Sequence, residues 1–158
     1  MNLRVTRVAA AAGCAIAALA AFTPRTSHDE RAASPPETMR GGIEATLARA
    51  VVGWTSGNLS EFMGVYLDAD RTSYATKSAY IHGRTDIGAR YTAQFKPGAA
   101  RDSLRLEKID VDSLAPGVAE VMAFYVQFRH DSTTGHGPTS LVMERVQGTW
   151  YIVHDHSG

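Results

Sequence analysis

Apolar residues at helical spacing predict two consecutive helices at the start of the globular part of the chain. Between Ile43 and Trp54 they fall at i, i+4, i+7, i+8 and i+11, which makes one buried helix face, and Gly57 can end this helix. Asn58 can cap the next helix, because Glu61 stands three residues later, where a capping box requires an acidic or amide side chain. We expect Leu59, Phe62, Met63 and Tyr66 to form the buried stripe of this second helix.

A third helix is predicted after Gly83, with its apolar residues at i, i+4 and i+8, and it should stop before Pro97. Alternating residues at 71–76 predict a short strand between the second and third helices. This strand can pair with residues 79–82.

After Gly98 the chain alternates as strands do, with one break in the alternation. The apolar residues before Glu107-Lys108 and those after it would lie on opposite faces of a regular strand, which predicts a β-bulge that bends the sheet. We expect turns at 115–117 and at Gln147-Gly148, and a loop over 131–135. The pattern predicts an α+β fold in which three N-terminal helices pack on a strongly bent antiparallel sheet.

The N-terminal segment has the pattern of a secretory signal peptide. Arg4 and Arg7 precede an uncharged, Ala-rich run over 8–22, which is shorter than the roughly 20 residues of a membrane span. Residues 18–20 read Ala-Leu-Ala, the small-x-small pattern of a cleavage site. The alternatives are an uncleaved anchor and a lipid attached at Cys14, but the apolar run continues well past that cysteine.

Three parts of the chain follow from this interpretation: a signal peptide over 1–20, a Pro-rich disordered tether over 21–40, and a folded domain over 41–158. The protein is then exported, to the periplasm or out of the cell. Cleavage removes the single cysteine, which fits an oxidising compartment, and leaves no permanent membrane span.

Charge and motifs exclude several function classes. Among the 158 residues, 16 basic side chains balance 16 acidic ones without a basic stripe, so we expect no nucleic-acid partner. The glycine-rich motifs that bind phosphates or dinucleotides are absent, and we expect no cofactor.

Three segments together carry a resemblance to a known family: WTSGNLSEFMGVYLDADRTSY, HGRTDIGARY and the C-terminal TWYIVHDHS. In this order they resemble the SnoaL-like branch of the nuclear transport factor 2-like superfamily, over residues 41–158. The resemblance implies a cone with an internal pocket, a fold that hosts enzymes, binding modules and dimerisation domains.

In the enzymes of that superfamily, a carboxylate or histidine in the apolar pocket acts as acid or base while a tyrosine hydroxyl stabilises charge on oxygen. Ketosteroid isomerase, one of them, is a known example of a carboxyl tuned in this way. On this basis we predict acid/base roles for His154, Asp70 and Tyr74. The predicted ligand-binding residues are Tyr91, Tyr125, Trp150 and His156.

Strand parity supports His154 in particular. In an uninterrupted last strand, one face holds Trp150, Ile152, His154 and His156. Trp150 and Ile152 are apolar, so the face that holds them should be buried. This places His154 toward the pocket and Asp155 on the opposite face. Two alternatives stay open: a core histidine bonded to backbone, and a metal site made by His154, His156 and His130.

Two functions remain at this stage. In the first, the chain binds a small hydrophobic molecule in its pocket and can also act on it as a cofactor-free isomerase, cyclase or hydratase. In the second, the chain is a non-catalytic interaction module. We expect a homodimer, and the interaction module would form it through the outer sheet face.

Overall fold

The computed structural model describes residues 38–158, so the predicted signal peptide and nearly all of the predicted tether lie outside the described residues. Within residues 38–158 the elements follow the order α1 (Met39–Ser56), α2 (Leu59–Met63), β1 (Ser73–Thr76), β2 (Ala79–His82), α3 (Arg84–Tyr91), β3 (Ser103–Ala115), β4 (Val118–Arg129), β5 (Ser132–Val146) and β6 (Thr149–Ser157). The strands form one sheet in the order β2-β1-β6-β5-β4-β3. The predicted α+β architecture is confirmed.

The sheet is mixed, so the prediction of a wholly antiparallel sheet is wrong at one junction. Strands β1 and β6 run parallel, with Ser73 opposite His154 and Tyr74 opposite Asp155. All the other neighbours are antiparallel. Parallel neighbours need a long connection, and here the connection contains β2, α3 and the three strands of the meander.

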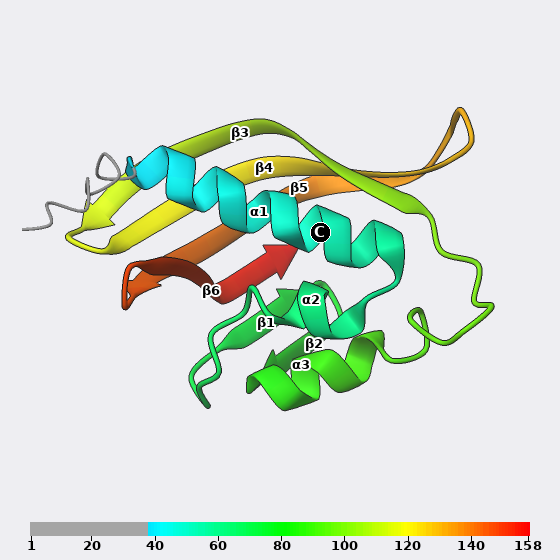
Figure 1. Ribbon diagram of the computed structural model, residues 1–158, viewed down its shortest axis with the longest axis horizontal. Coiled ribbons are helices and arrows are strands. Elements are labelled where there is room, and N and C mark those ends of the chain that lie inside the picture. Colours follow the sequence, from blue (N-terminus) through cyan, green and yellow to red (C-terminus); the bar gives the residue numbers. More distant parts are fainter. Residues whose placement is uncertain (1–37) are drawn as a thin grey trace, which may run out of the picture. The chain divides into compact units, whose positions relative to one another are not determined.

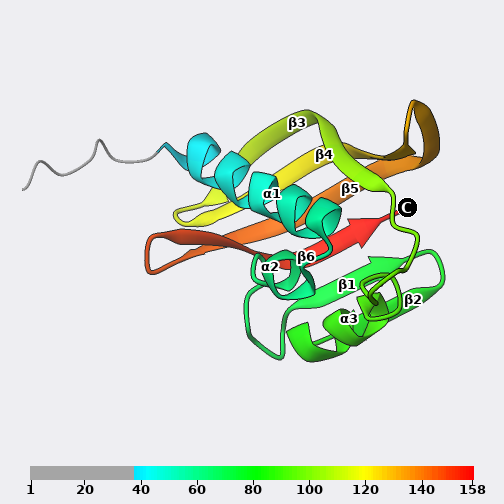
Figure 2. The ribbon, with the colours of Figure 1, turned by 45° about the vertical axis from the view of Figure 1, so that its right-hand side comes forward.

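Helix α1 lies across the inner face of the sheet, while α2 and α3 lie beside β1 and β2 (Figure 1, Figure 2). Two long-range hydrogen bonds fix α1 in this position. The Thr46 hydroxyl donates to the Trp150 carbonyl at 3.1 Å, and the Trp54 indole donates to the Asp102 carbonyl at 2.8 Å. The Trp54 ring is buried and packs edge-on against Phe62.

Local sequence signals explain where α1 and α2 begin and end. The Thr38 side chain caps the first turn of α1, and Gly57 ends the helix at φ 79° in the left-handed region that glycine favours. The Asn58 side chain accepts from the Glu61 backbone N–H, as predicted. Helix α2 stops at Met63, so Tyr66 lies beyond it and bridges to Ile152 of β6.

Irregularities in the strands shape the bend of the sheet. The predicted bulge near Glu107 is confirmed by a register shift there and by Lys108 at φ 52°. The predicted turn at Gln147-Gly148 joins β5 to β6 with both residues at positive φ. Strand β5 already begins at Ser132, so the loop predicted over 131–135 is wrong, because these residues extend the hairpin with β4.

From Thr38 to Gly158, no helix combines the length and the apolar character that crossing a membrane requires.

Candidate functional site

A cavity of about 290 Å³ lies between α1, α3 and the inner face of the sheet. Most of its wall is apolar, and the side chains that form this wall include Leu47, Trp54, Leu104, Leu106, Leu141 and Ile152. The volume is near the lower end of the range for small-molecule sites, about 300–1,000 Å³.

Asp155 supplies a carboxyl group to this apolar cavity, although the residue is only 6% exposed. Three hydroxyl groups donate to it. The Tyr66 hydroxyl donates to Oδ2 at 2.7 Å, and the Ser157 and Thr139 hydroxyls donate to Oδ1 at 2.7 and 3.4 Å. Neighbouring hydroxyls thus satisfy both carboxyl oxygens without a cationic partner in hydrogen-bond contact.

Burial raises the pKa of Asp155 above its ordinary value, because a carboxylate loses hydration in an apolar site. The hydrogen bonds from Tyr66, Ser157 and Thr139 act in the opposite direction and limit the rise. A carboxyl in this state holds its proton to higher pH than an exposed aspartate, and its ionised form is a stronger base.

Tyr66 and Tyr91, two tyrosines near the carboxyl, stay neutral. Burial is the main cause that raises the pKa of Tyr66 and Tyr91, and the nearby Asp155 charge adds to it. The Tyr74 ring centroid is 5.9 Å from that of Tyr91, and both rings line the cavity. The cavity therefore offers phenolic hydrogen-bond donors near one titratable carboxyl.

The face predicted for His154 is wrong, and a bulge in β6 is the reason. Met143 pairs with Ile152 and the adjacent Val142 pairs with His154, so Val153 is an extra residue without a partner on β5. The alternation shifts by one residue after Val153. Asp155 consequently faces the cavity beside Tyr74, and His154 lies on the other face.

On that other face, His154 Nδ1 lies 2.8 Å from the Ser73 hydroxyl. The alternative of a core histidine bonded to backbone does not match this arrangement, because His154 is only half-buried and its partner is a side chain. A catalytic role for His154 stays a prediction, although its side chain does not line the cavity.

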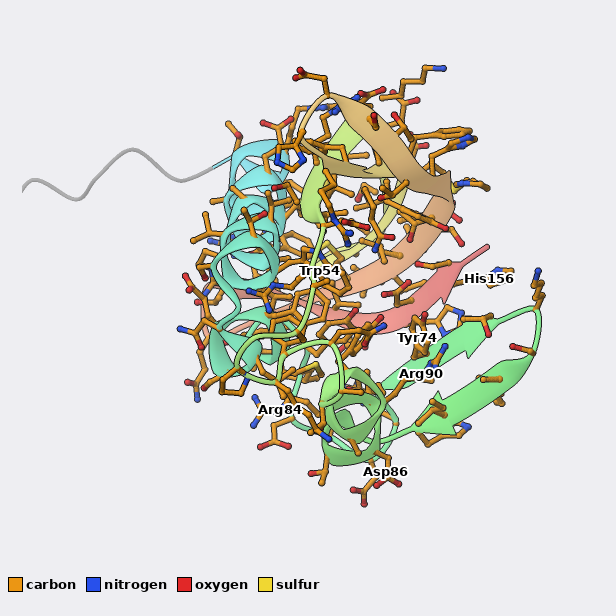
Figure 3. All side chains as sticks on the ribbon, turned by 90° about the vertical axis from the view of Figure 1, so that its right-hand side faces the viewer. Trp54, Tyr74, Arg84, Asp86, Arg90 and His156 are labelled. Carbon is orange, nitrogen blue, oxygen red and sulfur yellow. The ribbon has the colours of Figure 1, made fainter. Side chains whose placement is uncertain are left out.

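The remaining predicted site residues divide into two groups. Tyr74, Tyr91 and Tyr125 line the cavity, and the Tyr125 hydroxyl donates to the Gly158 carbonyl at 2.8 Å. The residues that lie elsewhere are Asp70, which is exposed after α2, Trp150, which is buried in the core, and His156, which is exposed. Figure 3 shows Tyr74 facing the interior and His156 at the outer side of β6.

Within residues 38–158 no group of three histidine or acidic side chains could hold a metal ion. His130 lies in the turn between β4 and β5, and it does not join His154 and His156 in such a group.

Asp155 and Tyr66 are the residues that sequence reasoning missed. Tyr66 fitted the apolar stripe of a longer second helix, and Asp155 fitted the solvent face of a regular strand. No local signal identifies the face of Asp155, because residues 150–153 are four consecutive apolar or aromatic residues and do not show where the alternation shifts.

Comparisons with known proteins support the fold. No protein-family model matches the chain, and no curated protein matches it significantly. Among solved structures, an NTF2-like protein of unknown function from Shewanella oneidensis is similar at 21% identity and a TM-score of 0.69, over 76% of this chain and 98% of that one.

Two further structures are similar at lower identity. A protein with a cystatin-like fold from Nostoc punctiforme shares 10% identity at a TM-score of 0.64, over 75% of this chain and 88% of that one. A candidate scytalone dehydratase from Novosphingobium aromaticivorans shares 12% identity at 0.62, over 73% and 80% of the two chains. The chain has the cystatin-like fold that it shares with these NTF2-like structures.

Proposed function

We propose that this protein binds a small hydrophobic molecule in the cone and acts on it by cofactor-free acid/base chemistry, with Asp155 as the proton-transfer group. The observation that carries the proposal is a buried carboxyl with a raised pKa inside an apolar cavity. A purely structural aspartate at this position would more commonly pair with a cation or face solvent.

The chemistry requires few groups. The Asp155 carboxylate removes a proton from carbon next to a carbonyl, and the C–H electron pair moves into the enolate. A neutral phenol, from Tyr74 or Tyr91, donates a hydrogen bond to the enolate oxygen. Return of the proton from Asp155 to another carbon gives an isomer. In a dehydration, the enolate expels a β-hydroxyl group, which takes the proton from Asp155 and leaves as water. In a cyclisation, the enolate carbon attacks a second carbonyl of the same molecule, and the oxygen of that carbonyl takes the proton from Asp155. The similarity to a candidate scytalone dehydratase supports this reaction class through the shared fold.

Hydrogen–deuterium exchange of β-tetralone, a bicyclic ketone, tests the proposal without knowledge of the natural substrate. In D₂O, Asp155 would take an α-proton, exchange it with solvent and return a deuteron. We expect the protein to accelerate the loss of the α-proton NMR signal. Asp155→Asn should reduce this acceleration by about 10²–10⁴-fold, the usual contribution of general acid/base catalysis to a rate.

Asp68→Asn is the matched control, because Asp68 is exposed and pairs with Arg84 outside the cavity. It should leave the exchange rate unchanged. If the protein bound β-tetralone and gave the same exchange rate with and without Asp155, the carboxyl would have no role in proton transfer.

Export is the second part of the proposal, supported by the N-terminal charge and hydropathy pattern alone. Intact-mass measurement of the protein from the exported fraction of its native host should give a chain that lacks residues 1–20. A mass that includes Met1 would contradict cleavage.

An exposed apolar pair on the outer sheet face favours a second candidate function, assembly. Met122 and Phe124 of β4 point away from the cavity and are 44% and 39% exposed. We propose that a second copy of this chain covers them. A dimer of this kind leaves the cavity free, so the two functions are compatible.

A further inference from the structure

Arg90 is the one charged side chain besides Asp155 among the cavity-lining residues of the described chain. It lies near the C-terminal end of α3, and unlike Asp155 it is exposed. A residue that both lines the cavity and contacts solvent belongs to the rim. Arg90 and Tyr74 both line the cavity, and Tyr74 pairs with Asp155 in the sheet.

Arg90 forms no ion pair within residues 38–158, whereas several other exposed arginines do. Arg84, at the start of the same helix, donates to Asp68 at 2.6 Å, and Arg71 forms two hydrogen bonds with Glu144. Asp86 is one helical turn before Arg90 and could have paired with it. In Figure 3, however, Asp86 lies apart, below α3.

The charges therefore differ between the two ends of the cavity. Arg90 at the rim presents a cation that no carboxylate of the described chain neutralises. Asp155 in the interior would repel an anion, and its burial disfavours a second negative charge beside it. Between them, the apolar wall offers no partner for a charged group.

We propose that the cavity binds an amphipathic monoanion, with its carboxylate against Arg90 at the rim and its uncharged, oxygen-bearing end beside Asp155. The guanidinium can donate two parallel hydrogen bonds to a carboxylate, which fixes the ligand's direction in the cavity. This inference rests on the proposed function, since it names the class of molecule on which Asp155 acts. The cavity volume of about 290 Å³ suits an acid with one or two fused rings.

Naphthylacetate and naphthylacetamide are suitable probes, because they have the same bicyclic body and nearly the same shape, while only the acid carries a negative charge. Isothermal titration calorimetry should show that the protein binds the acid about tenfold more tightly than the amide, the effect of one charge-assisted contact. Arg90→Gln should lower the affinity for the acid to that for the amide and leave the amide unchanged. Added salt should reduce the preference for the acid, because the rim is exposed.

Arg84→Gln is the matched control, since it removes the same charge from the same helix outside the cavity. It should leave both affinities unchanged. Equal affinities of the wild-type protein for acid and amide would overturn the inference, as would an equal effect of the two arginine substitutions.

The β-tetralone assay separates this inference from the proposed function. If the ketone exchanges in an Asp155-dependent way while the acid shows no preference over the amide, the proton-transfer function stands and the anion at Arg90 is overturned. If neither naphthyl probe binds and β-tetralone does not exchange, both are overturned.

Discussion

At the residue scale, the side chain that distinguishes this cavity is Asp155. Its oxygens accept hydrogen bonds from three hydroxyl groups, and these bonds stabilise the carboxylate. Burial removes hydration from the charged carboxylate and thereby favours the carboxylic acid. The effect of burial is the larger of the two, and the pKa of Asp155 is therefore raised. A bound ligand that excluded water from the cavity would raise the pKa of Asp155 further, because it would remove hydration from the carboxylate.

The raised pKa of Asp155 predicts how stability depends on pH. The native state holds a proton that the unfolded chain releases once the pH exceeds the ordinary carboxyl value of 3.8. The stabilisation from that proton is complete below 3.8 and is lost as the pH rises through the native pKa. The free energy of unfolding of the wild type, relative to Asp155→Asn, should therefore fall as the pH rises, in urea titrations from acid to neutral pH.

Asp102 offers a control of opposite sign. The Thr134 hydroxyl and the Arg129 guanidinium donate to this carboxylate, and they lower its pKa. Relative to Asp102→Asn, the wild type should lose stability as the pH falls through the lowered pKa. A pH-independent difference between the wild type and Asp155→Asn would contradict the raised pKa.

At the element scale, strand β6 sets which side chains enter the cavity. Its first half pairs regularly with β5, and its second half also pairs with β1, on its other edge. The extra residue at Val153 separates the two halves, and it allows Ile152 and Asp155 to face the same side.

A deletion in β6 should preserve proton transfer, and an insertion two residues later should abolish it. Deleting Val153 removes the extra residue and keeps Asp155 opposite Leu141, so we expect lower thermal stability but continued β-tetralone exchange. Inserting an alanine between His154 and Asp155 moves the carboxyl to the other face, and exchange should fall to the level of Asp155→Asn. Melting temperatures establish that both variants fold, and exchange retained by the insertion variant would contradict this register.

The sequence predicted the elements whose signals are local. Helix α1, the Asn58 cap and the bulge near Glu107 each depend on residues within a few positions of one another, and all three are present. The parallel pairing of β1 with β6 joins residues about 80 positions apart, and no local pattern encodes it. The bulge at Val153 lacks the change of apolar parity that marked the first bulge, so local alternation could not predict which of His154 and Asp155 faces the cavity.

At the scale of the whole molecule, the described domain has one face that holds the cavity and one that exposes apolar side chains. The outer face of β4 carries Phe124, with the Lys108 ammonium 5.2 Å from the ring centroid. Large exposed apolar residues that lie together on a sheet commonly mark an interface.

This face predicts the oligomeric state. Light scattering after size exclusion should give the mass of two chains for the wild type and of one chain for Phe124→Lys, because the new charge would be buried beside Lys108. Val52→Lys is the matched control: Val52 is 54% exposed on α1, away from the sheet's outer face, and its substitution should leave a dimer. A monomeric wild type would contradict the proposed assembly.

The bulge at Val153 also bears on how this chain is compared with its relatives. A related protein whose last strand lacks the extra residue would carry its pocket-facing group one position earlier in the sequence. A gapless alignment of the two strands would then set Asp155 of this chain against an outward-facing residue, and His154 against the residue that does the chemistry. Alignments of this chain with proteins of the same fold should place a one-residue gap at Val153, so that carboxyls and imidazoles are matched by the face they occupy.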